Sequence, residues 1–205
     1  MIKLGVTGLI SSGKTTATNI ISKLGIPKFC ADQTVKNIYL HNLNFKRKLF
    51  KLAPQLKNKK FLKKETTKIV YKNKGFLKEL EAIIHPLVRE KMIKFIYTND
   101  RNKKKIIVLD IPLLIENKLQ KYFDKIILIN CSRNLRKKRF TKKVKNKTFF
   151  DIIDKKQLSF KEKKKYCDYV INNSSSIKDI KKKVIKPNEA NSINGTVGIF
   201  SVIIG

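Results

Sequence analysis

Acidic residues are scarce in this chain of 205 residues. Asp and Glu occupy 15 positions against 48 for Lys and Arg, so the formal net charge is +33. Such a charge suits a nucleic-acid-binding protein. The lysines, however, are spread along the whole chain, in runs such as 57–60, 103–105 and 163–165, and form no arginine-rich stripe with interleaved aromatics. We therefore favour a solvated lysine-rich surface and expect no specific nucleic-acid partner.

Cysteine and long hydrophobic runs are also rare. The three cysteines, Cys30, Cys131 and Cys167, lie far apart without metal-ligand spacing, and neither His41 nor His85 belongs to a Cys/His cluster. No apolar run is long enough to cross a bilayer, and the amino terminus leads into a short strand-like segment instead of a signal peptide. We expect a globular, cytoplasmic protein without a membrane partner.

One motif is complete. Residues 8–15 read G-L-I-S-S-G-K-T and fit the phosphate-binding loop G-x-x-x-x-G-K-[ST]. The glycines let the backbone curl around an anion, the amides that follow can form a nest, the lysine would reach the β- and γ-phosphates, and the final threonine would bind Mg²⁺. The predicted ATP-binding residues are therefore Gly8, Ser11, Ser12, Gly13, Lys14, Thr15 and Thr16.

The flanking segments support this interpretation. Residues 2–7 are short and largely apolar, as a buried strand is, and residues 16–24 place apolar side chains on one helical face before Gly25. The alternative is a glycine turn that binds nothing. The order strand, loop, helix favours phosphate binding.

Asp32 follows a second short strand, predicted at 26–29. It would lie at the carboxyl end of the sheet, where ligands bind in α/β folds. It could cap the helix that starts near Gln33, or act as a general base that accepts a hydroxyl proton in phosphoryl transfer. The spacing leaves both roles open, and they are compatible.

Asp110 lies within a second apolar segment, residues 106–114. A strand that ends in Asp is typical of the second acidic strand of phosphate-loop enzymes, which holds Mg²⁺. The alternative is a strand-terminal Asp that caps a turn. The length of the run favours the metal role, and Glu116 could lie near the same cleft.

The intervening segments are mainly helical. Residues 33–73 are amphipathic with a break at Pro54, and the next helix carries His85 and Arg89, four positions apart, which could face one cleft or simply be solvated. Pro86 should kink or restart that helix.

The carboxyl-terminal half continues the alternation of strands and helices. Strands are predicted at 123–131 and 167–173, and a last helix at 177–185. The basic helix from Asn134 could fold over ATP as a lid or form a solvated face. The whole pattern predicts a doubly wound α/β fold.

The order of the motifs resembles the dephospho-coenzyme A kinase family of P-loop kinases. The resemblance covers residues 1 to about 186, and its two most specific blocks are His-Pro-x-Val-Arg and Asp-x-Pro-Leu-Leu. It is carried by Val6-Thr7-Gly8, Ser12-Gly13-Lys14-Thr15, Leu24-Gly25-Ile26-Pro27, Ala31-Asp32, Leu80-Glu81, Ile84-His85-Pro86-Leu87-Val88-Arg89, Asp110-Ile111-Pro112-Leu113-Leu114 with Glu116, and Asp168-Tyr169-Val170-Ile171-Asn172-Asn173.

The resemblance implies transfer of the ATP γ-phosphate to the ribose 3′-hydroxyl of dephospho-coenzyme A, the last step of coenzyme A synthesis. It also implies one P-loop kinase domain, 1–186, with about five parallel strands. Its parts would be a core (1–31, 104–135 and 166–186), a helical acceptor-binding insertion (32–103) and a lid (136–165). Residues 187–205 would be an extension of unknown role.

The resemblance also implies residue roles. Asp32 would be the catalytic base, assisted by Lys14 and Arg139, the latter a lid arginine, and Asn173 would lie where the last strand meets the adenine. Lys143 would also bind ATP. Acceptor binding would fall to Asp32, His85, Arg89, Pro112 and Leu113, and metal binding to Thr15 and Asp110.

ATP and Mg²⁺ are the expected cofactors, dephospho-coenzyme A the other substrate, and a monomer the expected state. One alternative is another small-metabolite or nucleoside (monophosphate) kinase. A basic nucleic-acid-binding ATPase, with a steep salt dependence, and a decayed enzyme are further alternatives.

Three positions depart from the family pattern. Cys30 stands where the family usually has Asp, Ser11 replaces the central glycine of the loop, and Lys143 stands where a second lid arginine is usual. The Ser11 amide can serve only if its backbone angle suits a residue other than glycine.

Lys143 generates the first prediction. Lysine keeps the positive charge but lacks the bidentate fork of arginine, so turnover or ATP affinity should be lower than an arginine would give. Lys143→Arg is therefore expected to raise kcat or lower KM for ATP in a steady-state assay. Two unchanged constants would contradict this reasoning.

Overall fold

The computed structural model describes residues 1–144, 148–174 and 180–181. The chain forms two compact units. One, here called the core unit, contains Met1–Phe29 and Asn99–Gly205. The other, here called the helical unit, contains Cys30–Thr98.

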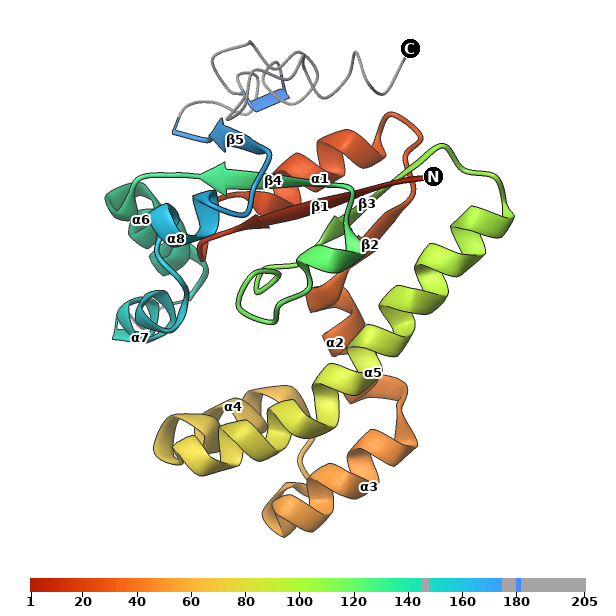
Figure 1. Ribbon diagram of the computed structural model, residues 1–205. Helices are drawn as coiled ribbons and strands as arrows, with labels where there is room; N and C mark the ends of the chain where they lie inside the picture. Colours follow the sequence, from red (N-terminus) through yellow and green to blue (C-terminus); the bar gives the residue numbers. More distant parts are fainter. Residues whose placement is uncertain (145–147, 175–179, 182–205) are drawn as a thin grey trace. The chain divides into compact units, whose positions relative to one another are not determined.

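The core unit is built on a five-stranded parallel sheet (Figure 1). Its strand order is β2-β3-β1-β4-β5. Side chains of β3 are buried throughout, which is the pattern of a parallel strand covered on both faces. The strands are β1 (Ile2–Gly8), β2 (Lys28–Cys30), β3 (Ile106–Asp110), β4 (Lys125–Asn130) and β5 (Tyr169–Asn172).

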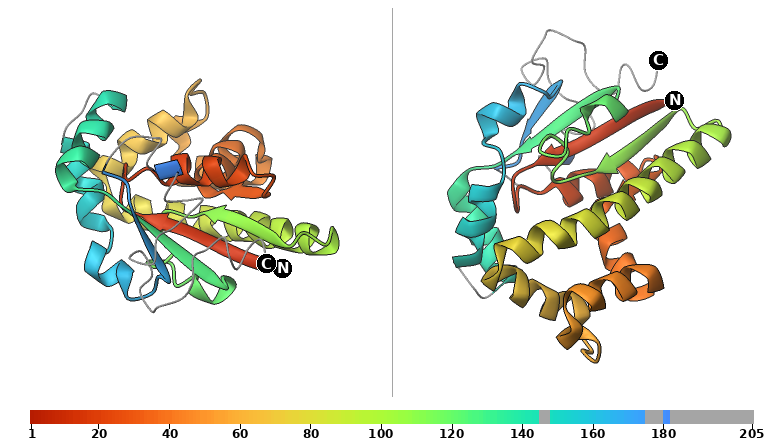
Figure 2. Two further views of the ribbon diagram at one scale, coloured as in Figure 1. Left: turned by 90° about the horizontal axis from the view of Figure 1, so that it is seen from above. Right: turned by 60° about the horizontal axis from the view of Figure 1, so that its bottom comes forward.

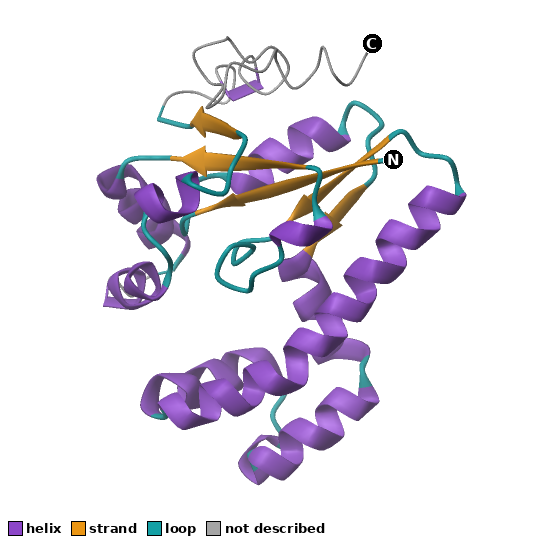
Figure 3. Ribbon diagram, in the orientation of Figure 1, coloured by secondary structure: helices purple, strands orange, loops and turns teal. Residues whose placement is uncertain are grey.

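Helices follow the strands in the core unit and make up nearly all of the helical unit (Figure 3). In the core unit they are α1 (Lys14–Ser22), the 3-10 helix η2 (Gln120–Tyr122), α6 (Arg133–Lys143), α7 (Thr148–Lys156) and α8 (Phe160–Lys164). In the helical unit they are α2 (Ala31–His41), α3 (Leu43–Leu52), η1 (Pro54–Leu56), α4 (Leu62–Lys72) and most of α5 (Lys74–Arg101).

The register of the sheet brings the carboxyl ends of its strands together. Val6 pairs with Asp110 on one side and with Ile127 on the other, and Gly8 lies opposite Ile129. A Cβ atom on Gly8 would lie 2.4 Å from the Ile129 carbonyl oxygen, so only glycine permits this approach. Figure 2 shows α6, α7 and α8 grouped at this end of β1 and β4.

Each unit has its own apolar core. In the core unit α1 packs on the sheet through Ala17 and Ile21, against Leu4, Val6, Val108, Ile127 and Ile129. In the helical unit the amphipathic helices meet around Phe45, Leu49, Leu56, Leu80 and Ile84. Burial raises the pKa of Tyr39, in that second core, to about 12.

The predicted doubly wound α/β fold with about five parallel strands is confirmed. Of the expected kink or restart at Pro86, the restart is wrong, because α5 continues through that residue, and the kink stays a prediction. Of the helix predicted at 177–185, only Ile180 and Lys181 lie within the described residues, and both are helical. The extension 187–205 lies outside them, and the division into core, insertion and lid stays a prediction. Among the described helices none has the length and apolar character needed to cross a bilayer.

Candidate active site

The phosphate-loop motif folds into a tight turn between β1 and α1. Three of its residues have positive φ: Gly8 (153°), Ser11 (56°) and Gly13 (100°). Ser11 therefore adopts the left-handed conformation that usually favours glycine. A residue with a Cβ atom therefore stands at a position that favours glycine, at some cost in backbone strain.

The helix α1 begins at Lys14, two residues before the helix predicted at 16–24, and Lys14 is buried there. Its Nζ donates hydrogen bonds to the carbonyl oxygens of Gly8 (2.8 Å) and Leu9 (3.0 Å). The ammonium thus lies across the loop and would have to exchange these partners to reach a phosphate.

The two residues predicted to bind metal lie together. Thr15 Oγ1 donates to Asp110 Oδ2 over 3.1 Å, which joins the start of α1 to the end of β3. Thr18 Oγ1 lies 3.3 Å from the same oxygen. Sequence reasoning missed Thr18, although its place three residues after Thr15 puts both hydroxyls on one face of α1.

Two further predicted residues converge on the loop. Asn173 Nδ2 donates to the Ser12 carbonyl oxygen over 2.7 Å, and Arg139 Nη1 lies 3.5 Å from that same oxygen. Thus the end of β5 and the middle of α6 both contact the phosphate loop. The adenine role of Asn173 stays a prediction. Lys143 ends α6, but its side chain lies outside the described part of the chain.

The Ser12 hydroxyl is buried and has no hydrogen-bond partner among the described residues. Burying such a group typically costs about 1–3 kcal/mol. A cost of this kind inside a ligand-binding loop is a common sign of functional constraint.

The helical unit carries Asp32 in the first turn of α2, with its side chain exposed. The N-cap of α2 is Cys30, so the predicted capping role of Asp32 is wrong: the helix begins at Ala31, before Asp32. A carboxylate in the first turn is favoured by the helix dipole.

Lys63, on α4, interacts with Asp32, and sequence reasoning missed it. Loss of hydration lowers the pKa of the Lys63 ammonium, and the opposing effect of the Asp32 charge is next in size. The repulsion from Lys36 lowers that pKa further. A lysine in a lysine-rich segment gave no signal of this proximity.

His85 and Arg89 line one cavity of about 670 Å³ in the helical unit, together with Ile93, Lys94 and Tyr97 on the same helix. The volume falls in the range of small-molecule sites. Pro112 and Leu113, also predicted to bind the acceptor, belong to the core unit. The Pro112 carbonyl oxygen there accepts a hydrogen bond from Thr7 Oγ1 over 3.0 Å.

The structure also corrects the interpretation of the lysine run 163–165 as solvated. Lys163 is fully buried, and its Nζ lies 2.7 Å from the Glu116 carboxylate. Arg136 is likewise buried and pairs with Asp154 over 2.5 Å. Both pairs depend on tertiary packing, which residue type alone does not reveal.

A parallel sheet with a phosphate loop after β1 and a carboxylate at the end of β3 defines the class of P-loop kinases. The sequence model described as Dephospho-CoA kinase matches residues 2–179. The Dephospho-CoA kinase of Bartonella quintana is 35% identical over 88% of this chain and 93% of its own, and that of Rickettsia bellii is 32% identical over 90% and 94%. The solved structure of Dephospho-CoA kinase from Campylobacter jejuni superposes with a TM-score of 0.64 at 27% identity, covering 89% of this chain and 93% of its own. The chain belongs to the dephospho-CoA kinase family and is an ATP-dependent phosphotransferase.

Gly13 generates a prediction about the loop. A Cβ atom at this position would lie 2.0 Å from Asn173 Nδ2, on a backbone with φ of 100°. Gly13→Ala is therefore expected to weaken ATP binding by roughly tenfold or more, because loop and Asn173 must separate. The matched control is Gly25→Ala, where φ is 82° but no atom lies within 4 Å. Calorimetric titration should show a loss of ATP affinity only at Gly13, and equal losses would contradict the assignment.

Proposed function

We propose that this chain transfers the γ-phosphate of ATP to the ribose 3′-hydroxyl of dephospho-coenzyme A. Membership of the family supports the choice of acceptor. The observation that supports phosphoryl transfer is the contact between Thr15 and Asp110, because it joins a loop hydroxyl to a strand-end carboxylate beside the phosphate loop.

Mg²⁺ fits this pair of residues. A hydroxyl and one carboxylate are the hard oxygen donors that Mg²⁺ takes from a protein, with water and phosphate oxygens as its other ligands. We infer that Thr15 and Asp110 hold the ion, Asp110 directly or through water. When bound, the ion would neutralise charge on the phosphates.

The phosphate loop would hold the triphosphate through its amides and Lys14. Arg139, half-buried beside the Ser12 carbonyl, is placed to offset charge on the transferring group. An arginine in that role contributes roughly a thousandfold or more to turnover in phosphoryl-transfer enzymes. Asn173 supports the loop through its hydrogen bond to the same Ser12 carbonyl oxygen.

Asp32 is proposed as the group that orients the acceptor hydroxyl and accepts its proton. Its exposed position at the first turn of α2 leaves the carboxylate accessible. His85 and Arg89 would bind the acceptor in the cavity on α5, where cationic side chains suit its phosphate groups. A cytoplasmic location and a monomeric state remain predictions.

A direct test incubates the purified protein with ATP, Mg²⁺ and dephospho-coenzyme A and detects coenzyme A by mass spectrometry. We expect coenzyme A to form, and EDTA to stop its formation. Adenosine and AMP serve as competing acceptors. Preference for either over dephospho-coenzyme A, or no coenzyme A at any protein concentration, would refute the proposed reaction.

Asp32→Asn tests the proposed base. Loss of a positioned general base typically lowers turnover by roughly a hundredfold or more, whereas ATP affinity should stay near that of the wild type. Asp100→Asn, on the exposed last turns of α5, is a control for the loss of one carboxylate. A wild-type kcat in the Asp32→Asn variant would show that Asp32 is not the general base.

A further inference from the structure

The loop residue Ile10 is held by one side chain from α6 and one from the linker between α7 and α8. Its amide donates to Gln157 Oε1 over 2.7 Å, across 147 residues of sequence. Its carbonyl oxygen lies 3.5 Å from Arg136 Nη1. Gln157 lies between α7 and α8 and contacts a backbone group that precedes the amides of the predicted phosphate nest.

Ile10 immediately precedes Ser11, the residue with φ of 56°. A left-handed conformation at a residue with a Cβ atom is unfavourable by itself, and it persists when surrounding contacts over-determine it. The bond from Gln157 fixes the Leu9–Ile10 peptide group, and the contact from Arg136 holds the Ile10–Ser11 peptide group. Together they restrain the rotation that would relieve Ser11. The Ser12 amide donates to the Leu9 carbonyl oxygen over 3.1 Å, which closes the same turn.

Gln157 is itself anchored to the loop that follows β3. The next residue, Leu158, donates its amide to Glu116 Oε1 over 3.1 Å. Glu116 is paired with the fully buried Lys163, whose Nζ also lies 3.3 Å from the Pro112 carbonyl oxygen. Breaking a buried ion pair leaves an uncompensated charge, so this anchor is stiff.

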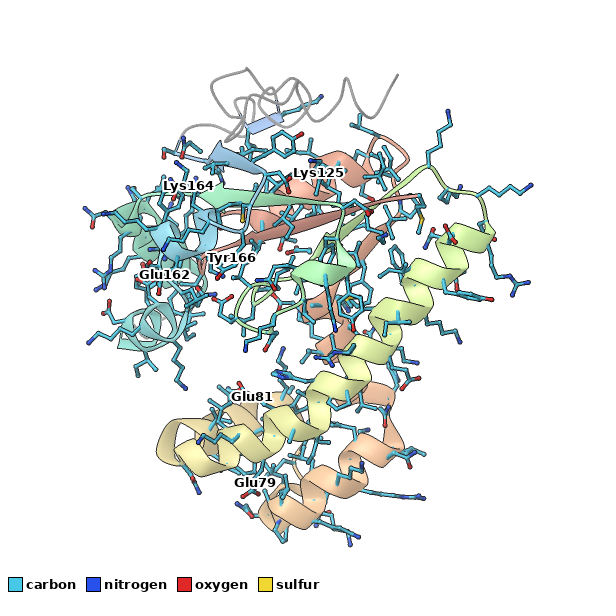
Figure 4. All side chains as sticks on the ribbon, in the orientation of Figure 1. Glu79, Glu81, Lys125, Glu162, Lys164 and Tyr166 are labelled. Carbon is cyan, nitrogen blue, oxygen red and sulfur yellow. The ribbon has the colours of Figure 1, made fainter. Side chains whose placement is uncertain are left out.

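Both helices beside Gln157 are fixed as well. On α7, Asp154 pairs with the buried Arg136 of α6 over 2.5 Å. At the start of α8, Ser159 and Glu162 form a capping box, and the hydrogen bonds from Ser159 lower the pKa of Glu162. Glu162 is labelled in Figure 4. The linker that carries Gln157 is therefore held from both sides.

We propose that Gln157 is a positioning residue that holds the phosphate loop in its ATP-binding shape and offsets the backbone cost of Ser11. The inference deepens the proposed ATP-binding role of the loop, on which it rests. The proposal predicts that the effects of substitutions at positions 11 and 157 on ATP affinity are coupled. With glycine at position 11 the loop no longer needs the restraint that Gln157 provides.

The test measures the Kd of a non-hydrolysable ATP analogue with Mg²⁺ by calorimetry, using the full chain. Gln157→Met keeps the length of the side chain but removes its accepting oxygen, and is expected to raise Kd about tenfold. Ser11→Gly in the Gln157→Met background is expected to bring Kd back to within about threefold of the wild type, because glycine adopts positive φ freely. Gln120→Met, on η2, is the matched control.

Two results would overturn the inference. One is an unchanged Kd in Gln157→Met. The other is a raised Kd that Ser11→Gly does not recover, because a merely structural role of Gln157 has no reason to depend on position 11. Where the Met variant is not recovered folded, Gln157→Asn, one methylene shorter, is measured in the same pair of backgrounds. Analogue binding needs no acceptor, so a protein that binds ATP without making coenzyme A refutes the proposed reaction and still permits this test.

Discussion

The backbone of the phosphate loop is the constraint on which the rest of the site depends. Positive φ at Gly8, Ser11 and Gly13 bends the chain so that successive amides can face an anion. Each of these residues also meets a close neighbour or adjoins a restrained one: Gly8 approaches Ile129, Gly13 approaches Asn173, and Ser11 follows the amide held by Gln157. Contacts with the surrounding structure therefore impose the conformation of the loop at several points, and the local sequence permits that conformation.

Those surroundings come from the carboxyl ends of the strands. Parallel pairing of β1 with β3 and β4 brings Gly8, Asp110 and Asn130 to one edge of the sheet. Asp110 can then receive the Thr15 hydroxyl, and Asn173, one residue beyond β5, can reach the Ser12 carbonyl. The chemistry of the site therefore follows from sheet topology, because residues far apart in sequence become neighbours through strand order alone.

The sequence was sufficient to predict those features that depend on a local pattern of residues. The phosphate-loop motif, the apolar strands and the strand-end Asp110 predicted the sheet and named Thr15 and Asp110 as metal-binding residues, which the structure joins by a hydrogen bond. Prediction failed where long-range packing decides. Lys163 belongs to a lysine run yet is buried against Glu116, and nothing in the local pattern distinguishes it from its solvated neighbours. Asp32 lies just inside a helix instead of at its cap, since a helix boundary within one or two residues is not fixed by residue type.

The same long-range contacts limit how the predicted lid, residues 136–165, could move. At one end of this segment Arg136 Nε donates to the Cys131 carbonyl oxygen over 3.2 Å, and at the other end the buried Lys163 of α8 is paired with Glu116. Removing one partner of a buried pair typically costs about 3–5 kcal/mol, so a rigid swing of the whole segment would have to meet that cost at the Lys163–Glu116 pair. A rearrangement of side chains on ATP binding costs less free energy than a movement of the whole segment. Lys14 can exchange the carbonyl oxygens of Gly8 and Leu9 for phosphate oxygens while the backbone restraints stay intact.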